Sequence, residues 1–398
     1  MGIISPILAR LKLLYKWEYF WLCIILVATL ALHFSIINNP KQLVLDEQHY
    51  VTDARNIIQN HEDLRPEHPP LAKLFVVAGI EIFGDNPIGW RLFSVLFGTI
   101  LIVLFYFTCR KLGMSRMATN IATFLLAFEN LTFIQANVAM LDVYFVTFML
   151  LGFLLYLYRK YISSGVAFGL SGLSKLYGAF AVPVVIIHCL FTPERERRCI
   201  LTVIVALVSF MALLPIFDFA ISQHLENPIS RIFQMISLSS SQTFANTTHP
   251  ALSRPWDWVF MYKPFVYWHA PHYIGAISFT VWLLIIPSFA YMIYCAVKKV
   301  EAGLFGAAWF FSTYILLLPI SLITNRTSFL YYFYPSVGAI CLGIGLGLSQ
   351  LLDISKTWKS KKLRLTALLG VGFYLFLHLA FLIIVSPLTG WVRFNIKG

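Results

Sequence analysis

Charged side chains are scarce in this chain of 398 residues. They make up 12% of it, about half of the ~25% that is typical of soluble globular domains. Acidic residues are the scarcer sign, with 18 Asp and Glu against 30 Lys and Arg. So few charges exclude a disordered chain and, despite the formal net charge of +12, a nucleic-acid-binding protein.

Cysteine motifs are absent as well. The six cysteines form no CxxC pair and no spacing of the kind that binds a metal. This pattern argues against a Cys-ligated metal centre. We therefore expect all six to be small, buried apolar side chains, which is the usual place of a free cysteine.

Apolar residues are abundant instead, at 59% of the chain with a mean hydropathy of +0.76. Soluble domains contain about 45–50% by the same kind of count. A helix needs roughly 20 apolar residues to cross a bilayer, and several segments satisfy this requirement. The candidate spans are residues 19–37, 91–110, 116–135, 138–158, 199–217, 273–297, 303–323, 329–351 and 364–386.

A further apolar stretch, 163–191, is too long for one comfortable span and carries Lys175 in its middle. A break near Lys175 would divide it into two short helices. The sequence thus predicts an all-α polytopic membrane protein with about eleven transmembrane helices. We expect one transmembrane domain, 1–398, with no soluble domain attached.

The basic residues predict the orientation of these spans. With the N-terminus in the cytoplasm, the inside loops hold 18 of the 30 Lys and Arg residues but five of the 18 acids, as the positive-inside rule requires. We expect a multi-pass protein of the cytoplasmic membrane. Two long loops, 38–90 and 218–272, then face the outside, and the first of them is rich in acids.

Two short helices are predicted in the first outer loop. Asp46 precedes a segment in which Val51, Ala54 and Ile57 recur at helical spacing, so we expect Asp46 to cap a helix lying along the membrane surface. Further on, paired prolines pre-set a second helix at about 71–83. Its first N–H groups, together with Lys73, offer an anion site. Outer acids are usually only solvated, but their concentration here with two histidines favours a functional site.

Seven motifs occur in order from about residue 45 to residue 335. They are Asp46-Glu47; His68-Pro69-Pro70-Leu71-Ala72-Lys73; Trp90-Arg91-Leu92-Phe93-Ser94 with Gly98; Ala139-Met140-Leu141-Asp142-Val143; the Gly-rich segment 169–178 with Lys175; Ser253-Arg254-Pro255-Trp256-Asp257-Trp258; and Arg326 before Phe329-Leu330-Tyr331-Tyr332-Phe333-Tyr334-Pro335. This ordered set resembles the protein O-mannosyltransferases, and the resemblance covers most of the chain.

The resemblance implies a GT-C fold and a glycosyltransferase that takes a sugar from a polyprenyl-phosphate donor. Eukaryotic members carry a soluble β-trefoil domain in the central loop, and 218–272 has no room for one. We therefore expect the prokaryotic type, which moves a sugar, expected to be mannose, to Ser or Thr of exported proteins. Related aminoarabinose transferases act on lipid A and show Lys-Pro-Pro where this chain has His68-Pro69-Pro70, so a lipid or glycan acceptor is the alternative.

The resemblance assigns the role of catalytic base to Asp46, with Glu47 beside it as an orienting or acceptor-binding group. A single in-line attack would invert the sugar, and no strong general acid is needed because the phosphate is a good leaving group. Charges at membrane depth usually face a cavity or a partner. The residues expected to bind the donor phosphate are Arg91, Lys73, Lys175 and Arg326, and those expected to line the site are His49, Tyr50, Glu67, His68, Asp142, Trp256 and Tyr332.

Three alternatives stay open at this point. The basic residues can instead reach the interface or pair with an acid, and Asp142 can orient Arg91 or Lys175. No cofactor is required, although in the aminoarabinose transferases the acid before the Lys-Pro-Pro element and a loop histidine can hold a metal, so Glu67 and His68 are candidate ligands for a divalent ion. A transporter is the remote alternative, disfavoured because we detect no internal repeat and the acids crowd one outer loop.

The expected partners are the polyprenyl donor, a protein or lipid acceptor and the bilayer, without nucleic acid; a dimer is left open.

Overall fold

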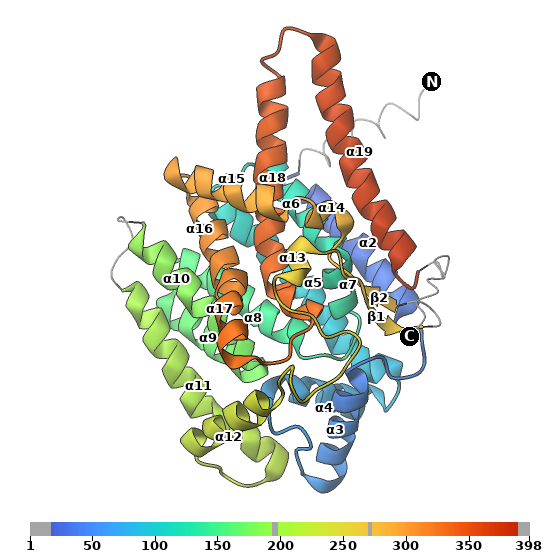
Figure 1. Ribbon diagram of the computed structural model, residues 1–398, viewed down its shortest axis with the longest axis vertical. Helices are drawn as coiled ribbons and strands as arrows, with labels where there is room; N and C mark the ends of the chain where they lie inside the picture. Colours follow the sequence, from blue (N-terminus) through green and yellow to red (C-terminus); the bar gives the residue numbers. More distant parts are fainter. Residues whose placement is uncertain (1–16, 193–197, 270–272, 389–398) are drawn as a thin grey trace.

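The computed structural model describes residues 17–192, 198–269 and 273–388. Helices dominate this part of the chain, with one small antiparallel hairpin (Figure 1). The elements are α2 (Phe20–Ile36), α3 (Glu47–Asn60), α4 (Leu71–Phe83), α5 (Pro87–Lys111), α6 (Arg116–Ala127), α7 (Asn130–Gln135), α8 (Asp142–Leu157), α9 (Tyr161–Ser174), η1 (Leu176–Phe180), α10 (Ala181–Leu190), α11 (Cys199–Ser222), α12 (Pro228–Ser241), α13 (Asp257–Phe260), β1 (Phe265–Trp268), β2 (Tyr273–Gly275), α14 (Phe279–Trp282), α15 (Ile285–Val297), α16 (Glu301–Phe310), η2 (Phe311–Ile315), α17 (Leu317–Thr324), η3 (Leu330–Phe333), α18 (Tyr334–Ser355) and α19 (Lys361–Val385).

The spans agree with the prediction in kind but not in number. Within the described residues, five helical segments are long and apolar enough to cross a membrane, and four shorter apolar helices accompany them. The expected count of eleven is therefore not confirmed. The break at Lys175 is confirmed, because this residue is extended between α9 and η1, with φ −160° and ψ 133°.

One predicted span is wrong in its first half. Segment 273–297 begins as strand β2, whose Ile274 pairs with Val266 of β1, and only its later part forms α15. The β-branched and aromatic residues on both sides of this connection favour a hairpin over a helix. The expected helical membrane fold holds, and this two-stranded hairpin is a local exception to it.

The two helices of the first long loop form where the apolar pattern places them. Val51 and Ala54 of α3 are fully buried, and α4 spans the predicted residues 71–83. α4 packs closely on α5 because two glycines meet there: a Cβ on Gly79 would lie 2.1 Å from the carbonyl oxygen of Gly89. These contacts hold α3 and α4 against the start of α5.

The bundle has two distinct ends in Figure 1. Helices α3, α4 and α12 gather at one end, whereas the hairpin of α18 and α19 projects at the other. α5 runs between these ends, because its 25 residues rise about 1.5 Å each, or about 36 Å in all. Its last turn carries Arg110 and Lys111. Of the basic residues predicted to face the cytoplasm, Arg10, Lys12, Lys16, Arg195 and Arg197 lie outside the described residues.

The cysteine expectation is wrong at one place. Cys189 at the end of α10 and Cys199 at the start of α11 form a disulfide, while Cys23, Cys109, Cys295 and Cys341 are free. A separation of ten residues across a helix connection matches no sequence motif, so the pairing was not predictable from the spacing.

Candidate active site

A polar cavity of about 200 Å³ lies at the end of the bundle where α3, α4 and α12 meet. It collects residues from both long loops, from the break after α9 and from the segment before α18. The lining residues are Leu45, Asp46, His49, Tyr50, Arg65, Glu67, His68, Lys175, Ser239, Gln242, His249, Phe265, Arg326, Phe329, Tyr331 and Tyr332. Eight of them were expected at the site from the sequence.

Asp46 is the carboxylate that faces this cavity. It precedes α3, but its side chain makes no capping bond to the helix, which corrects the expected capping role. Instead it accepts a hydrogen bond of 3.1 Å from the hydroxyl of Tyr331. Burial raises the pKa of Asp46 above its ordinary value, opposed by His49, the Tyr331 bond and Lys175. The result is a carboxylate more basic than an aspartate in water, open to the cavity.

Glu47 points the other way and does not line the cavity. Its carboxylate is fully buried and accepts bonds of 2.8 Å from Nε and Nη2 of Arg91 and from the backbone N–H groups of Val44 and Ala139. Four donors use the acceptor positions of a carboxylate. The expected role in catalysis or acceptor binding is therefore corrected: Glu47 anchors the segment that carries Asp46.

Arg91 completes this anchor. Its remaining N–H groups donate to the carbonyl oxygens of Ile37, Pro40 and Gln42 at 2.8–3.0 Å. A guanidinium has five N–H donors, and all five are used by the protein. Arg91 is also absent from the cavity lining and fully buried. The expectation that it binds the donor phosphate does not fit this geometry.

The ammonium group of Lys73 likewise binds other groups of the protein. It is fully buried, and its ammonium group donates to Asp63 and to the carbonyl oxygen of Arg65 at 2.7 Å, with Asp53 3.5 Å away. Two carboxylates compensate one buried cation. The predicted anion site at the start of α4 is thus already occupied by protein groups, and Lys73 does not reach the cavity.

Arg231 of α12 also binds the first long loop, 38–90. The guanidinium is 3% exposed and donates to the carbonyl oxygens of Pro66 and His68, while lying 3.3 Å from Asp63 and 3.4 Å from Asp218. These contacts hold the backbone on both sides of Glu67, which lines the cavity. No motif marked Arg231, because its partners Pro66 and His68 in the first long loop lie about 165 positions away in the chain.

Lys175 brings a cation to the cavity wall. Its ammonium group donates to both oxygens of Asp142, at 2.8 and 2.9 Å, and lies 4.8 Å from the ring centre of Tyr332. Asp142 itself does not line the cavity. The alternative in which Asp142 orients Lys175 is therefore the one that the structure displays.

Arg326 is the second cation of the cavity. It lines the cavity together with Tyr332 and forms no ion pair within residues 17–192, 198–269 and 273–388. Its guanidinium is thus available to an anion in a way that the guanidinium of Arg91 is not. Lys175 and Arg326 stand on the side of the cavity that leads into the bundle.

Two smaller hollows continue the cavity from these cations. The first, about 140 Å³, is shared by Lys175 and Arg326 and reaches Leu176 and Phe180. The second, about 100 Å³, runs from Arg326 past Phe180 to Leu317 and Ile320. The lining thus changes from charged to apolar with distance from Asp46.

His68 and Tyr50 line the cavity together with the two cations. The Tyr50 hydroxyl lies 3.3 Å from Nε2 of His68. Burial, with the nearby ammonium groups of Lys175 and Lys73, holds the pKa of His68 well below its ordinary value, so its ring is neutral at pH 7. Glu67 also lines the cavity, 3.7 Å from Arg65. In the described part of the chain, no three His, Cys, Asp or Glu side chains form a group able to hold a metal ion.

Trp256 lies outside the cavity, 5.7 Å from the guanidinium of Arg254, so its expected place in the lining is corrected. Reasoning from the sequence missed several lining residues, among them Arg65, His249 and Tyr331. Tyr331 belongs to the aromatic motif 329–335, so the sequence could have identified it as a lining residue. His249 has no neighbouring signal, because only the fold brings the second long loop over the first.

Residues 78–220 match the family model described as dolichyl-phosphate-mannose-protein mannosyltransferase. This part of the chain is thus similar to the protein mannosyltransferase family. The polyprenol-phosphate-mannose–protein mannosyltransferase of Mycobacterium tuberculosis is 32% identical over 139 residues, which cover 33% of this chain and 26% of that protein. The protein of the same name from Corynebacterium glutamicum is 30% identical over 169 residues, 37% of this chain and 32% of that protein. The matched regions thus span a third or less of these curated relatives.

Solved structures share the fold of nearly the whole chain. The Saccharomyces cerevisiae protein O-mannosyltransferase Pmt1–Pmt2 complex bound to the sugar donor superposes with a TM-score of 0.76 at 12% identity, covering 94% of this chain and 90% of that one. ArnT from Cupriavidus metallidurans bound to undecaprenyl phosphate gives 0.62 at 16% identity, covering 94% and 77%. The predicted GT-C membrane fold is confirmed.

Proposed function

We propose that this protein is a membrane glycosyltransferase that moves mannose from a polyprenyl-phosphate donor to Ser or Thr hydroxyl groups of exported proteins. One observation carries the proposal: the Asp46 carboxylate shares a cavity with Lys175 and Arg326, and two hollows with an increasingly apolar lining continue from those cations. A donor of this class has the same sequence of parts, namely a sugar, a phosphate and a hydrocarbon chain.

The chemistry follows from these positions. Asp46 takes the proton of the acceptor hydroxyl, whose oxygen attacks the anomeric carbon of the sugar. The bond from that carbon to the phosphate oxygen breaks, and the phosphate leaves with the bonding electrons. Lys175 and Arg326 balance the added negative charge of the leaving phosphate. One displacement on the face opposite the phosphate inverts the anomeric carbon.

The neutral ring of His68 and the Tyr50 hydroxyl line the same cavity as Asp46, within which the sugar hydroxyls would lie. Both groups can donate or accept a hydrogen bond. Their role is therefore to orient the sugar, without adding a charge that would compete with Lys175 for the phosphate. His49, Glu67 and Tyr332 also line the cavity.

The deciding experiment is a transfer assay with purified protein, polyprenyl-phosphate mannose, and separate peptide and lipid acceptors. We expect mannose on Ser- and Thr-containing peptides and none when Asp46→Asn protein is used. A matched control is Glu81→Gln, which makes the same carboxylate-to-amide change at an exposed residue of α4. Transfer to the lipid acceptor alone would favour the aminoarabinose-transferase-like alternative, whose structural relative ArnT was solved with undecaprenyl phosphate.

We further propose that the cavity faces the outside of the cytoplasmic membrane and that the N-terminus is cytoplasmic. The argument is charge: the end of α5 opposite the cavity carries Arg110 and Lys111. The Cys189–Cys199 disulfide opposes this orientation, since it lies in a connection assigned to the reducing side. Labelling of a cysteine introduced at Glu62 or at Lys359 with a membrane-impermeant reagent in whole cells decides between the two orientations.

No cofactor enters this mechanism. We expect transfer to continue after treatment with a chelator, because Lys175 and Arg326 supply the positive charge. Loss of activity that a divalent ion restores would instead make Glu67 and His68 candidate ligands. Light scattering of the purified protein measures whether it forms the dimer left open above.

A further inference from the structure

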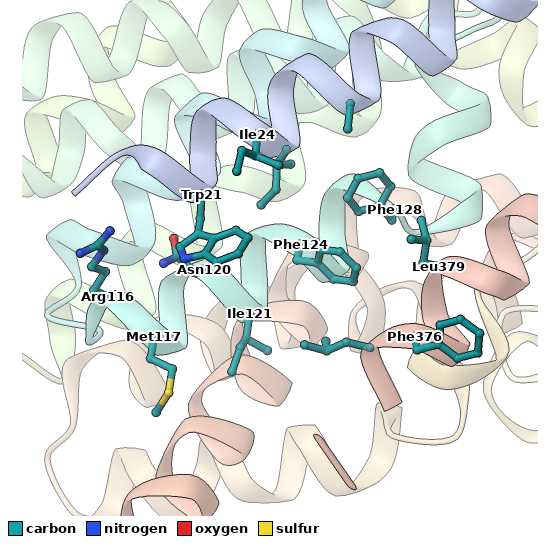
Figure 2. Close-up of a pocket in the computed structure, with 13 residues that line it drawn as sticks. Trp21, Ile24, Arg116, Met117, Asn120, Ile121, Phe124, Phe128, Phe376 and Leu379 are labelled. Carbon is teal, nitrogen blue, oxygen red and sulfur yellow. The ribbon is translucent and has the colours of Figure 1, made fainter. Parts of the chain in front are cut away.

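Exposed apolar side chains are expected on the membrane-spanning helices of this protein. Figure 2 shows such a place, where Trp21 and Ile24 of α2 and Phe376 of α19 line one apolar groove of about 720 Å³. These helices consist largely of apolar residues, so contact with lipid accounts for the exposure of their side chains. Helix α12 is different, because half of its 14 residues are polar and it still exposes large apolar side chains. Neither a purely apolar nor a purely aqueous environment suits such a helix.

The side chains of α12 divide into three stripes at helical spacing. The protein stripe packs against the rest of the molecule, with side chains at most 7% exposed: Arg231, Met235 and Ser239. The apolar stripe points away from the protein, with 56%, 68% and 51% exposure for Ile229, Phe233 and Ile236. The polar stripe is also exposed and consists of Ser230, Gln234, Ser237 and Ser241. At about 100° per residue, the three stripes lie roughly 120° apart around the helix.

This arrangement inverts that of an ordinary surface helix. A helix on a soluble protein buries its apolar side chains and exposes its charged ones. In α12 the guanidinium of Arg231 is 3% exposed, whereas the ring of Phe233 is 68% exposed. The apolar stripe therefore requires an apolar medium, and the polar stripe beside it requires water. One helix meets both media at the surface of a bilayer, and α12 lies at one end of the bundle (Figure 1).

The apolar stripe follows the lipid-facing surface of α11. α11 is long and apolar enough to cross a membrane, and near its end Ile216 and Phe219 are 56% and 49% exposed. Leu225, in the connection to α12, is 76% exposed. An ion pair of 3.4 Å between Asp218 and Arg231 holds the end of α11 beside the start of α12. The exposed apolar surface thus extends from a spanning helix onto α12.

The polar stripe lies on the side of α12 that faces water. Gln234 lines a polar cavity of about 700 Å³ between the end of α3, the end of α11 and α12. The same cavity is lined by exposed charged side chains, among them Glu62 and Glu226. Ionised carboxylates stay hydrated wherever the protein does not compensate them fully. Water and hydrocarbon are therefore both expected within one helix diameter of each other at α12.

The protein stripe holds the loop that lines the active site. Arg231 donates to the carbonyl oxygens of Pro66 and His68. The hydroxyl of Ser239 donates to the carbonyl oxygen of Glu67 at 3.3 Å, and Ser239 itself lines the active-site cavity. A displacement of α12 would therefore move three consecutive residues of this loop.

We propose that α12 is an interfacial anchor, which inserts its apolar stripe into the leaflet on the side of the active site and thereby fixes the loop that carries Glu67 and His68. The partner of the apolar stripe is the hydrocarbon of that leaflet. A lipid surface fits better than a protein, because the neighbouring surface of α11 already faces lipid. The placement of α12 is independent of the reaction, whereas its effect on transfer rests on the proposed function.

Spin-label EPR of the full chain tests the placement in vesicles of phosphatidylcholine and phosphatidylglycerol. One nitroxide is attached at Phe233→Cys and, as the matched control one turn along the same helix, another at Ser237→Cys. Both side chains are exposed, so the label replaces no packing. Labelling of the wild type gives the background from its four free cysteines. We expect the Phe233→Cys nitroxide to collide more with oxygen, which concentrates in hydrocarbon, than with a water-soluble nickel complex, and the Ser237→Cys nitroxide to show the reverse.

Rates of mannose transfer in the same vesicles test the effect on the loop. Phe233→Glu puts a charge into the hydrocarbon and should lower the rate about tenfold, because α12 would be displaced and positioning groups with it. Ser237→Glu adds the same charge to the polar stripe and should leave the rate unchanged. Neither residue lines the active-site cavity. A wild type that moves no mannose would refute the proposed function, and the spin labels would still decide the placement of α12.

Four results would overturn the proposal. Equal collision of the nickel complex with both nitroxides would place the apolar stripe in water. Protection of the Phe233→Cys nitroxide only in the presence of an acceptor peptide would make the acceptor the occupant. Dipolar broadening between two labelled molecules would make a second copy of the chain the occupant. Equal rates for Phe233→Glu and Ser237→Glu would separate the lipid contact from the active-site loop.

Discussion

Asp46 and Glu47 are adjacent in the chain but lie in opposite environments. Glu47 is fully buried, and four protein donors bind its carboxylate. Asp46 accepts one side-chain hydrogen bond, from Tyr331, and its remaining acceptor positions face the cavity. The same contrast separates Arg91, whose five donors are all used, from Arg326, which has no ion pair in the described residues. A charge that the protein has fully bonded supports structure, and a charge with open positions in a cavity is available for reaction.

The largest effect predicted by this contrast is a fall in the rate of mannose transfer by the Asp46→Asn variant. The amide keeps the size of the side chain but cannot accept a proton, so transfer should fall by about 10²–10⁴-fold, the usual contribution of a general base. Thermal stability should stay close to that of the wild type, because only the bond from Tyr331 is affected. Initial rates of mannose transfer and melting temperature in detergent are the two measurements. Transfer at more than a tenth of the wild-type rate would remove Asp46 from the mechanism.

Glu47→Gln should show the reverse pattern. It leaves the buried guanidinium of Arg91 without its counter-charge, which costs about 3–5 kcal/mol for a buried pair. We expect a strong drop in melting temperature, with loss of transfer only in proportion to unfolding. The matched control is Asp85→Asn, whose partner Arg55 is 36% exposed, so that removal of this pair should cost about 0.2–1 kcal/mol. Equal melting temperatures for the two variants would contradict the anchoring role of Glu47.

The sequence predicts local features of this protein far better than pairings across the chain. The apolar spacing of α3, the prolines before α4 and the break at Lys175 are local signals, and the structure has all three. The bonding of Arg91 was not predictable, because an arginine at membrane depth next to an acidic loop fits both a phosphate ligand and a buried ion pair. Only the bonds of Arg91 to the carbonyl oxygens of Ile37, Pro40 and Gln42 distinguish the two.

The role of α12 was not predicted either, because it also depends on a pairing between distant parts of the chain. Substitution of Arg231 tests that role. Arg231→Gln removes the charge that faces Asp63 and Asp218 and loosens the loop that holds Glu67 and His68. We expect about a tenfold lower rate, because small displacements of positioning groups weaken catalysis strongly.

Arg231→Lys supplies the charge without the guanidinium fork and should recover part of that rate. As Asp46 is untouched in both variants, the pH at which activity is half lost on the acid side should not move. A shift of that pH in Arg231→Gln would show that the residue acts on the base itself, and full activity would leave α12 without a positioning role.

The smallest expected effect concerns the single bond that Asp46 accepts. Burial raises the pKa of Asp46, and the Tyr331 hydroxyl lowers it again by bonding the charged form. Tyr331→Phe removes that bond, so the pKa should rise further. Because the base acts only when deprotonated, activity is lost as the pH falls through this pKa, and the acid limb of the rate profile should move to higher pH. Near neutral pH the rate should change only a few-fold, since one hydrogen bond contributes about 0.5–1.5 kcal/mol. A limb that moves to lower pH would mean that the hydroxyl stabilises the protonated form of Asp46, and the contrast with the fully bonded Glu47 would then lose its electrostatic basis.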